Sequence, residues 1–166
     1  MEKYFYAGGD RHHLALVNGI VAVDARAANA AGLGEIVAKL LVQSKLRSGY
    51  VLVDAKSCPG GTGARSELDA YIHSVYQSDG VLVVPLPEVR VEFEEESQHV
   101  NVLDALASSP VAADIVDTKA GFLALRPRSG SGEDAIDLAN FVYERARPAS
   151  SSVRMLSIVP KLTTFG

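Results

Sequence analysis

The chain has 166 residues, of which 48% are hydrophobic and 22% are charged, a composition typical of a globular protein that can bury a core. Its 16 lysines and arginines against 20 aspartates and glutamates give a formal net charge of −4, which makes nucleic acid an unlikely partner. The single cysteine excludes an internal disulfide and any paired-cysteine metal motif.

No membrane segment is expected, because no apolar stretch approaches the roughly 18 residues that a spanning helix needs. The first residues lack the basic and apolar regions of a secretion signal. We therefore expect a soluble, cytoplasmic protein folded as one domain over residues 1–166. A flexible loop is expected at about 126–132, and a break rich in proline and serine at about 148–152.

The first half of the chain predicts strands separated by helices. Residues 3–7 are typical of a strand, and Asn18-Gly19 between two apolar runs predicts a hairpin turn. Helical spacing of apolar residues predicts helices over 33–46 and 66–77. Each helix precedes a run that is apolar on both faces, at 50–55 and 81–85, which is typical of strands buried in a parallel sheet.

These patterns predict an α/β fold with a mixed sheet. Strands near 20–25, 50–55 and 81–85 would form its parallel centre, with helices on both faces. The second half adds the antiparallel parts: an alternating strand over 88–95 and a hairpin around 119–121. Helices are expected near 99–107 and over 133–147, the second capped by Ser131, and a last strand over 153–159.

A four-residue phrase occurs twice, as Val23-Asp24-Ala25-Arg26 and Val53-Asp54-Ala55-Lys56. Each copy ends a predicted strand, so in a parallel sheet both aspartates would meet at the edge where open α/β sheets keep their ligands. The simpler interpretation is that aspartate is common where strands give way to loops. In that case Asp54 forms an exposed ion pair with Lys56 or Arg26.

The segment from Asp54 to Lys56, with a predicted helix and a buried strand after it, resembles the PD-(D/E)xK nuclease superfamily over about 35 residues. The resemblance implies Asp24 and Asp54 as ligands of Mg²⁺ and Lys56 as the residue that orients the attacking water. Mg²⁺ is expected only on this hypothesis, and the sequence otherwise leaves the cofactor unknown. Asp24, Asp54 and Lys56 are thus the candidate catalytic residues. The Pro-Asp of that superfamily is missing before the strand, and a helix stands where it usually has a tight hairpin.

The glycine-rich loop at 57–66 offers a second possible site. Its Gly60, Gly61, Thr62 and Gly63 would let backbone amides approach a phosphate or nucleotide. The loop matches neither common phosphate-binding motif, and the carboxylates of the next turn oppose an anion. Cys58 beside a histidine would be a third possibility, a cysteine hydrolase, since a thiol near a helix start has a lowered pKa.

No catalytic constellation in the sequence is complete, so the favoured hypothesis is a non-enzymatic protein-binding or regulatory module. The run of glutamates at Glu92, Glu94, Glu95 and Glu96 forms an acidic patch. Such a patch is typical of small acidic immunity or antitoxin proteins that neutralise basic toxins. The expected partner is therefore another protein.

Overall fold

The computed structural model describes residues 3–58 and 67–158. The chain divides into two compact units. Among the described residues, unit 1 holds residues 3–15 and 85–155, and unit 2 holds residues 16–58, 67–84 and 156–158. No helix within these described ranges is long and apolar enough to cross a membrane.

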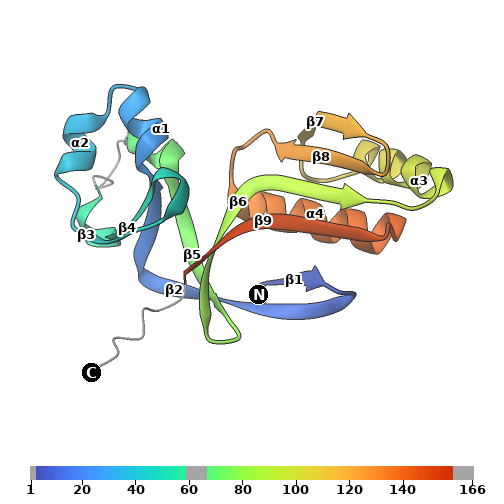
Figure 1. Cartoon of the computed structure of the whole chain (residues 1–166), viewed down its shortest axis with the longest axis horizontal. Helices are drawn as coiled ribbons and strands as arrows, with labels where there is room; N and C mark the ends of the chain where they lie inside the picture. The colour runs from blue at the N-terminus through green and yellow to red at the C-terminus, as the bar shows by residue number, and fades with distance from the viewer. Residues whose placement is uncertain (1–2, 59–66, 159–166) are drawn as a thin grey trace. The chain divides into compact units, whose positions relative to one another are not determined.

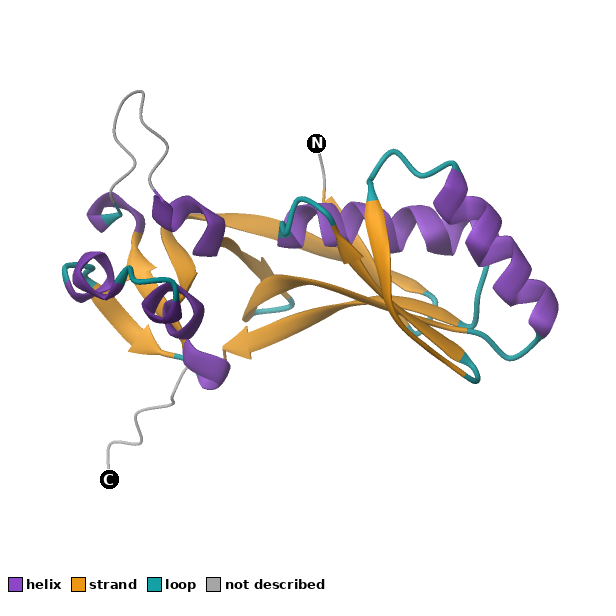
Figure 2. Ribbon diagram, turned by 90° about the horizontal axis from the view of Figure 1, so that it is seen from above, coloured by secondary structure: helices purple, strands orange, loops and turns teal. Residues whose placement is uncertain are grey.

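Unit 1 is a four-stranded antiparallel sheet with two helices on one face. The chain order is strand, helix, two strands, helix, strand, and the spatial order is β9-β6-β8-β7, the ferredoxin-like arrangement. The elements are β6 (Val81–Glu92), α3 (Glu96–Ala107), β7 (Ala113–Lys119), β8 (Phe122–Pro127), α4 (Gly132–Ala146) and β9 (Ser150–Ile158). Figures 1 and 2 show α3 and α4 on the same side of the sheet.

The core of unit 1 lies between this sheet and its two helices. Alternate residues of β6 and β8 point into it, including Val89, Val91, Leu123 and Leu125, all at most 1% exposed. Helix α4 contributes a full apolar side, with Ala135, Leu138, Ala139 and Val142 buried. The residues between these on the strands therefore point to the opposite face of the sheet, which carries no helix of unit 1.

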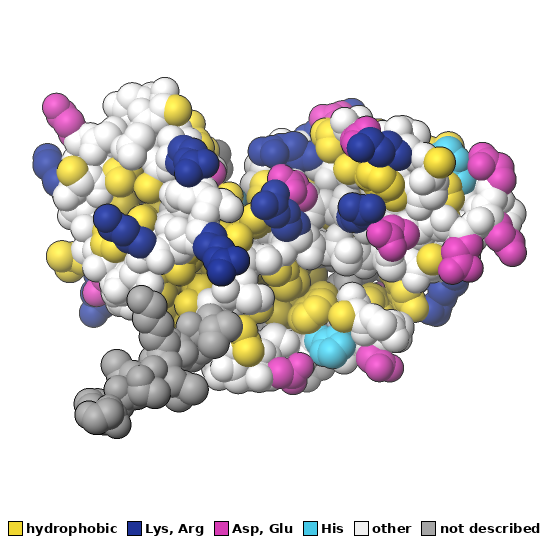
Figure 3. Space-filling view, in the orientation of Figure 1, with side chains coloured by type: hydrophobic (Ala, Val, Ile, Leu, Met, Phe, Trp, Pro, Cys, Tyr) yellow, Lys and Arg dark blue, Asp and Glu magenta, His cyan; other side chains and the backbone are white. Residues whose placement is uncertain are grey.

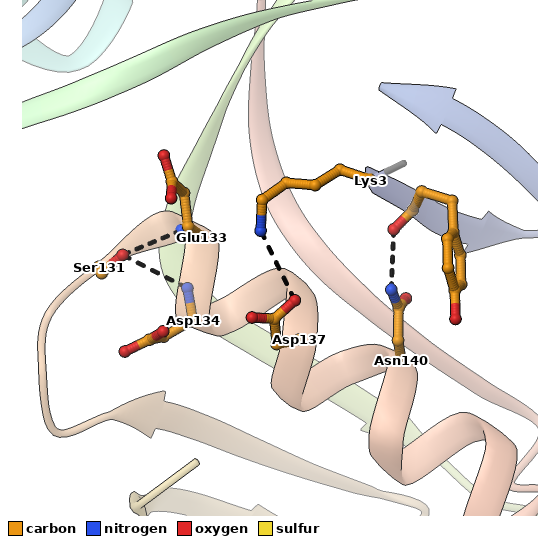
Figure 4. Close-up of polar contacts among 7 residues, drawn as sticks. Lys3, Ser131, Glu133, Asp134, Asp137 and Asn140 are labelled. Carbon is orange, nitrogen blue, oxygen red and sulfur yellow. Dashed lines mark hydrogen bonds and ion pairs between the residues drawn. The ribbon is translucent and has the colours of Figure 1, made fainter. Parts of the chain in front are cut away.

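A hairpin of β1 (Lys3–Ala7) and the first part of β2 (Asp10–Asp24) is fixed to α4. Its two-residue turn consists of Gly8 and Gly9, both with the positive φ that such a turn requires. Figure 4 shows two of its contacts with the helix. Asn140 donates a 2.8 Å hydrogen bond to the carbonyl of Tyr4, and the Lys3 Nζ lies 3.6 Å from the Asp137 Oδ1 in an ion pair. The figure also shows the predicted cap of α4, where the Ser131 hydroxyl accepts from the amides of Glu133 and Asp134.

Unit 2 consists of short elements on a small sheet of strand order β3-β4-β2-β5-β6. Besides the ends of β2 and β6, the elements are α1 (Ala25–Ala30), α2 (Gly34–Ala38), β3 (Val42–Lys45), η1 (Arg47–Gly49), β4 (Tyr50–Asp54), η2 (Ala55–Ser57), η3 (Glu67–Tyr71) and β5 (Ile72–Ser78). Val23, Ala28, Val53 and Leu68 are fully buried in its core.

The predicted parallel centre is wrong, because the nine strands of the described residues pair antiparallel. β2 and β4 are direct neighbours that run in opposite directions. The chain between them does not cross over through one long helix. It makes two short helices and then β3, which pairs antiparallel with β4. The apolar run in β4 reflects burial and not parallel pairing: Val53 lies in the core of unit 2 with Ala28 and Leu68, and Leu52, on the other face of the strand, is 6% exposed.

Two predicted helices and one predicted turn are also wrong. Of the helix expected over 33–46, only the five residues of α2 are helical, and β3 follows. The segment expected as a helix over 66–77 is η3 and then β5 in its described part. The predicted turn at Asn18-Gly19 lies inside the continuous strand β2. Gly19 alone has a positive φ there, whereas a hairpin turn of the expected type needs two such residues.

Most of the second half agrees with its predictions. Helices α3 and α4, the hairpin of β7 and β8, and strand β9 occur where the patterns indicate. The alternating strand expected over 88–95 is the continuation of β6, which begins at Val81. The single-domain organisation stays a prediction.

Candidate functional site

The register of β2 and β4 separates the two candidate carboxylates. Asp54 is paired with Ile20, whereas Asp24 is paired with Tyr50 at the other end of the ladder. Their positions are four steps apart along the ladder, roughly 13 Å. The expected meeting of Asp24 and Asp54 at one edge required parallel strands, so the structure does not bring these two side chains together.

Each of the two aspartates caps the short helix that follows its own strand. The Asp24 carboxylate accepts a 3.1 Å hydrogen bond from the amide of Ala27 at the start of α1. The Asp54 carboxylate accepts a 2.9 Å hydrogen bond from the amide of Lys56 in η2. The repeated phrase therefore marks two strand ends with the same local cap.

The Mg²⁺ site expected at Asp24 and Asp54 would need further ligating side chains close to them. Among residues 3–58 and 67–158, no three or more His, Cys, Asp or Glu side chains are grouped so that they could hold a metal ion. The Lys56 side chain is exposed. The loop residues Gly60, Gly61, Thr62 and Gly63 lie outside the described residues.

The Cys58 thiol does not have the lowered pKa that a cysteine hydrolase needs. Its burial, together with the negative charges of Asp69 and Asp54, raises the pKa above its ordinary value. This direction does not favour the cysteine-hydrolase alternative. Cys58 packs against the core of unit 2 as a small apolar side chain.

The acidic patch has local structural partners. Arg90 donates a 3.0 Å hydrogen bond to Glu92, and Glu96 lies 3.2 Å from the His99 ring. Glu94 and Glu95 stand at the start of α3, where the Gln98 side chain accepts hydrogen bonds from both of their amides. Negative charge is favourable at this end of a helix. The carboxylates of Glu92, Glu95 and Glu96 therefore have partners within unit 1, whereas Glu94 takes part through its backbone amide.

The face of the unit 1 sheet opposite its helices contains a hollow of about 490 Å³. We call it the sheet-face hollow. Its lining residues come from all four strands: Glu88, Val89 and Arg90 of β6, Val116 of β7, Phe122, Ala124, Leu125 and Arg126 of β8, and Ser152, Val153 and Arg154 of β9. In Figure 3, lysine and arginine side chains gather with hydrophobic ones over these strands.

Strand alternation and one bulge determine which side chains reach the hollow. Arg90 pairs with Ala124 across β6 and β8, and both residues point away from the core. In β7 the register shifts between Ile115 and Asp117, so Val116 is an extra residue of a bulge and is 58% exposed. The Arg90 guanidinium lies 4.1 Å from the centre of the Phe122 ring, a cation–π contact.

Comparison with known proteins identifies no relative: no family model, no curated protein and no solved structure matches this chain.

Sequence reasoning did not identify the sheet-face hollow. The alternation in 88–95 does indicate that Glu88, Arg90 and Glu92 share one exposed face, and the hairpin around Gly121 places Phe122 and Ala124 in the same way. What the pattern does not contain is the pairing of β6 with β8, because the 29 residues between Glu92 and Phe122 include a helix and another strand.

Proposed function

We propose that this protein is a non-enzymatic module that binds another protein, and that the sheet-face hollow of unit 1 is its contact surface. The observation that carries the proposal is the hollow itself: a concave, partly apolar face on the side of the sheet that α3 and α4 leave uncovered. A sheet with one face packed and one face open presents a rigid platform, since its side chains are positioned by regular strands.

The composition of the hollow supports a protein partner. Phe122, Ala124 and Val116 supply apolar area, and three arginines surround it. Aromatic residues and arginine are enriched at the energetic centres of protein interfaces, where apolar contacts exclude water around charged hydrogen bonds. The arrangement suits a contact of modest size, in which a segment of the partner enters the hollow.

An immunity-like or antitoxin-like role for this protein, acting in the cytoplasm, remains part of the proposal. We place the contact on the sheet-face hollow and not on the acidic patch, because Val116, Phe122 and Ala124 give the hollow an apolar floor, whereas Glu96 of the patch lies against His99.

Site-specific photo-crosslinking tests the proposal. A crosslinking amino acid at position 124, in the middle of the hollow, should capture a discrete protein in the native host. The same amino acid at position 104, exposed on α3, should not capture it. The captured protein is then purified, and its affinity for the full chain is measured by calorimetry.

A substitution in the hollow gives the decisive comparison. Ala124→Glu should lower the affinity for the partner at least about tenfold, since a carboxylate then occupies the apolar floor of the contact. Asp104→Lys, a charge change on α3, should leave the affinity unchanged. Equal affinity of Ala124→Glu and the unsubstituted chain, with circular dichroism showing intact folds, would remove the hollow as the contact surface.

A further inference from the structure

The sheet-face hollow is positive in an acidic protein. Its lining contains three arginines and one glutamate, and Glu92, which pairs with Arg90, lies on the same face, so basic side chains outnumber acidic ones there although the whole chain carries −4. Figure 3 shows basic side chains on this face of unit 1, with acidic ones between them. A local charge opposite in sign to that of the whole protein indicates which partners the surface attracts.

Two of the three arginines already have carboxylate partners. Arg154 donates a 3.1 Å hydrogen bond to Glu88, and Arg90 donates a 3.0 Å hydrogen bond to Glu92. Both pairs are exposed, with side-chain exposures between 48% and 58%, so they contribute little to stability. They do balance the charges of Arg90 and Arg154.

Arg126 is in a different situation. The residue paired with it across β7 and β8 is Asp114, but the Asp114 carboxylate is bound by Arg128 at 3.0 Å. Within residues 3–58 and 67–158, Arg126 therefore has no ion-pair partner. Its guanidinium can bind a carboxylate from another molecule through two parallel hydrogen bonds.

The floor beside Arg126 favours an apolar neighbour of that carboxylate. Ala124 stands two residues before Arg126 on β8 and so shares its face, and Phe122 lies two residues further back. The exposed Val116 borders the same area from β7. A partner segment with an aliphatic or aromatic side chain next to its acidic residue would fill both parts of the hollow.

The same face disfavours nucleic acid. Single-stranded RNA or DNA bound on an open sheet needs several stacked aromatic rings, and Phe122 is the one aromatic residue among those lining the hollow. Glu88 and Glu92 occupy outward positions of β6 and would repel a phosphate backbone. A peptide can place a single carboxylate on Arg126 and avoid these two glutamates.

We propose that the sheet-face hollow receives an extended acidic segment of the partner protein, with a carboxylate on Arg126 and an adjacent apolar side chain on Ala124 and Val116, beside the Phe122 ring that Arg90 contacts. This inference rests on the proposed protein-binding function and adds the chemistry of the recognised segment.

Selection from a displayed library of random peptides on the full chain tests the inference. Selected peptides should be enriched in aspartate or glutamate next to an apolar residue. Their affinity for Arg126→Gln should fall about tenfold. Arg145→Gln, a matched change at an exposed arginine of α4, should bind as well as the unsubstituted chain. Binding should weaken as salt is raised.

Other outcomes overturn the inference. Peptides enriched in lysine and arginine, peptides without charge preference, a failure to select any peptide, or equal binding to Arg126→Gln would each contradict it. Binding of an oligonucleotide at the same residues, seen by NMR, would assign the face to nucleic acid instead. The inference can fail alone: if Ala124→Glu still weakens the crosslinked partner, the proposed function stands and only the acidic segment is wrong. If Ala124→Glu has no effect on that partner, the proposed function fails as well.

Discussion

The Tyr4 hydroxyl donates a 2.7 Å hydrogen bond to the Glu144 carboxylate, which joins the hairpin of β1 and β2 to the last turn of α4. Because ionised tyrosine cannot donate this bond and would be repelled by the carboxylate, the contact raises the pKa of Tyr4 to about 12. Tyr6 stacks on Tyr143 beside it, with ring centres 4.4 Å apart.

The raised pKa of Tyr4 predicts a loss of stability at high pH. The contribution of this bond is complete below the ordinary tyrosine pKa of 10.0 and is lost as the pH rises through about 12. The melting temperature should therefore fall more steeply between pH 10 and 12 in the unsubstituted protein than in Tyr4→Phe. In Glu144→Gln the pKa of Tyr4 should move down toward 10, as measured by NMR titration of the Tyr4 ring. A Tyr4 that titrates near 10 in the unsubstituted protein contradicts this account.

Gly132 should be irreplaceable in unit 1. A side-chain carbon at this first residue of α4 would lie 2.0 Å from the Pro85 carbonyl oxygen, so the helix or β6 would have to move. We expect Gly132→Ala to lower the free energy of unfolding by about 3 kcal/mol. Gly34 provides the control, as the first residue of α2, where the added carbon meets only the Asn29 side chain at 3.4 Å. Gly34→Ala should change stability by less than about 1 kcal/mol in urea denaturation.

The capping role of Asp24 separates a structural from a metal-binding residue. Asp24→Ala should cost about 1 kcal/mol of unfolding free energy, whereas Asp24→Asn should nearly preserve it, because asparagine also accepts the Ala27 hydrogen bond. In calorimetry, adding Mg²⁺ should leave the melting temperature of each of the three proteins unchanged. A rise with Mg²⁺ that both substitutions abolish would restore the metal-ligand hypothesis for this carboxylate.

The turn between β5 and β6 should depend on Gly80. Ser78 and Val81 pair across the two-residue turn of Asp79 and Gly80, which have φ values of 50° and 77°. Since a side chain at Gly80 would meet no atom within 4 Å, the cost of Gly80→Ala is purely conformational, about 1–2 kcal/mol. Asp79→Asn should remain close to the unsubstituted protein, because asparagine adopts this conformation readily. If Gly80→Ala and the unsubstituted protein have the same free energy of unfolding in urea, the positive φ assigned to Gly80 in this turn is contradicted.

This turn also shows why one prediction failed. Asp-Gly between two apolar runs is a strong hairpin signal, but the apolar residues Leu68, Tyr71, Ile72, Val75 and Tyr76 also have helical spacing. β5 is buried on both faces, so it lacks the alternation that distinguishes a strand from a helix. The β-branched residues Ile72 and Val75 and the Asp-Gly turn were the available signals for a strand.

The sequence likewise predicted the local surroundings of Asp24 and Asp54 but not the distance between them. The caps at Asp24 and Asp54 follow from residues next to them in the sequence, and the interpretation of these aspartates as strand-end residues was available from the repeated phrase. Their separation depends on the antiparallel register of β2 with β4. That register arises because the chain reverses between β3 and β4, where Ser48 and Gly49 both have positive φ. In the sequence alone, the same Ser48-Gly49 pair indicates the end of a helix over 33–46.

By itself, the sequence determined the features that depend on neighbouring residues. These are the amphipathic helix α4 with its Ser131 cap, helix α3, the hairpin around Gly121 and the alternating faces of β6 and β8. Only the tertiary structure decided which strands became neighbours and in which direction. It thereby separated Asp24 from Asp54 and brought Arg90, Arg126 and Arg154 around one apolar hollow. The physical reason is that strand pairing joins residues far apart in the chain, whereas periodicity and capping are local.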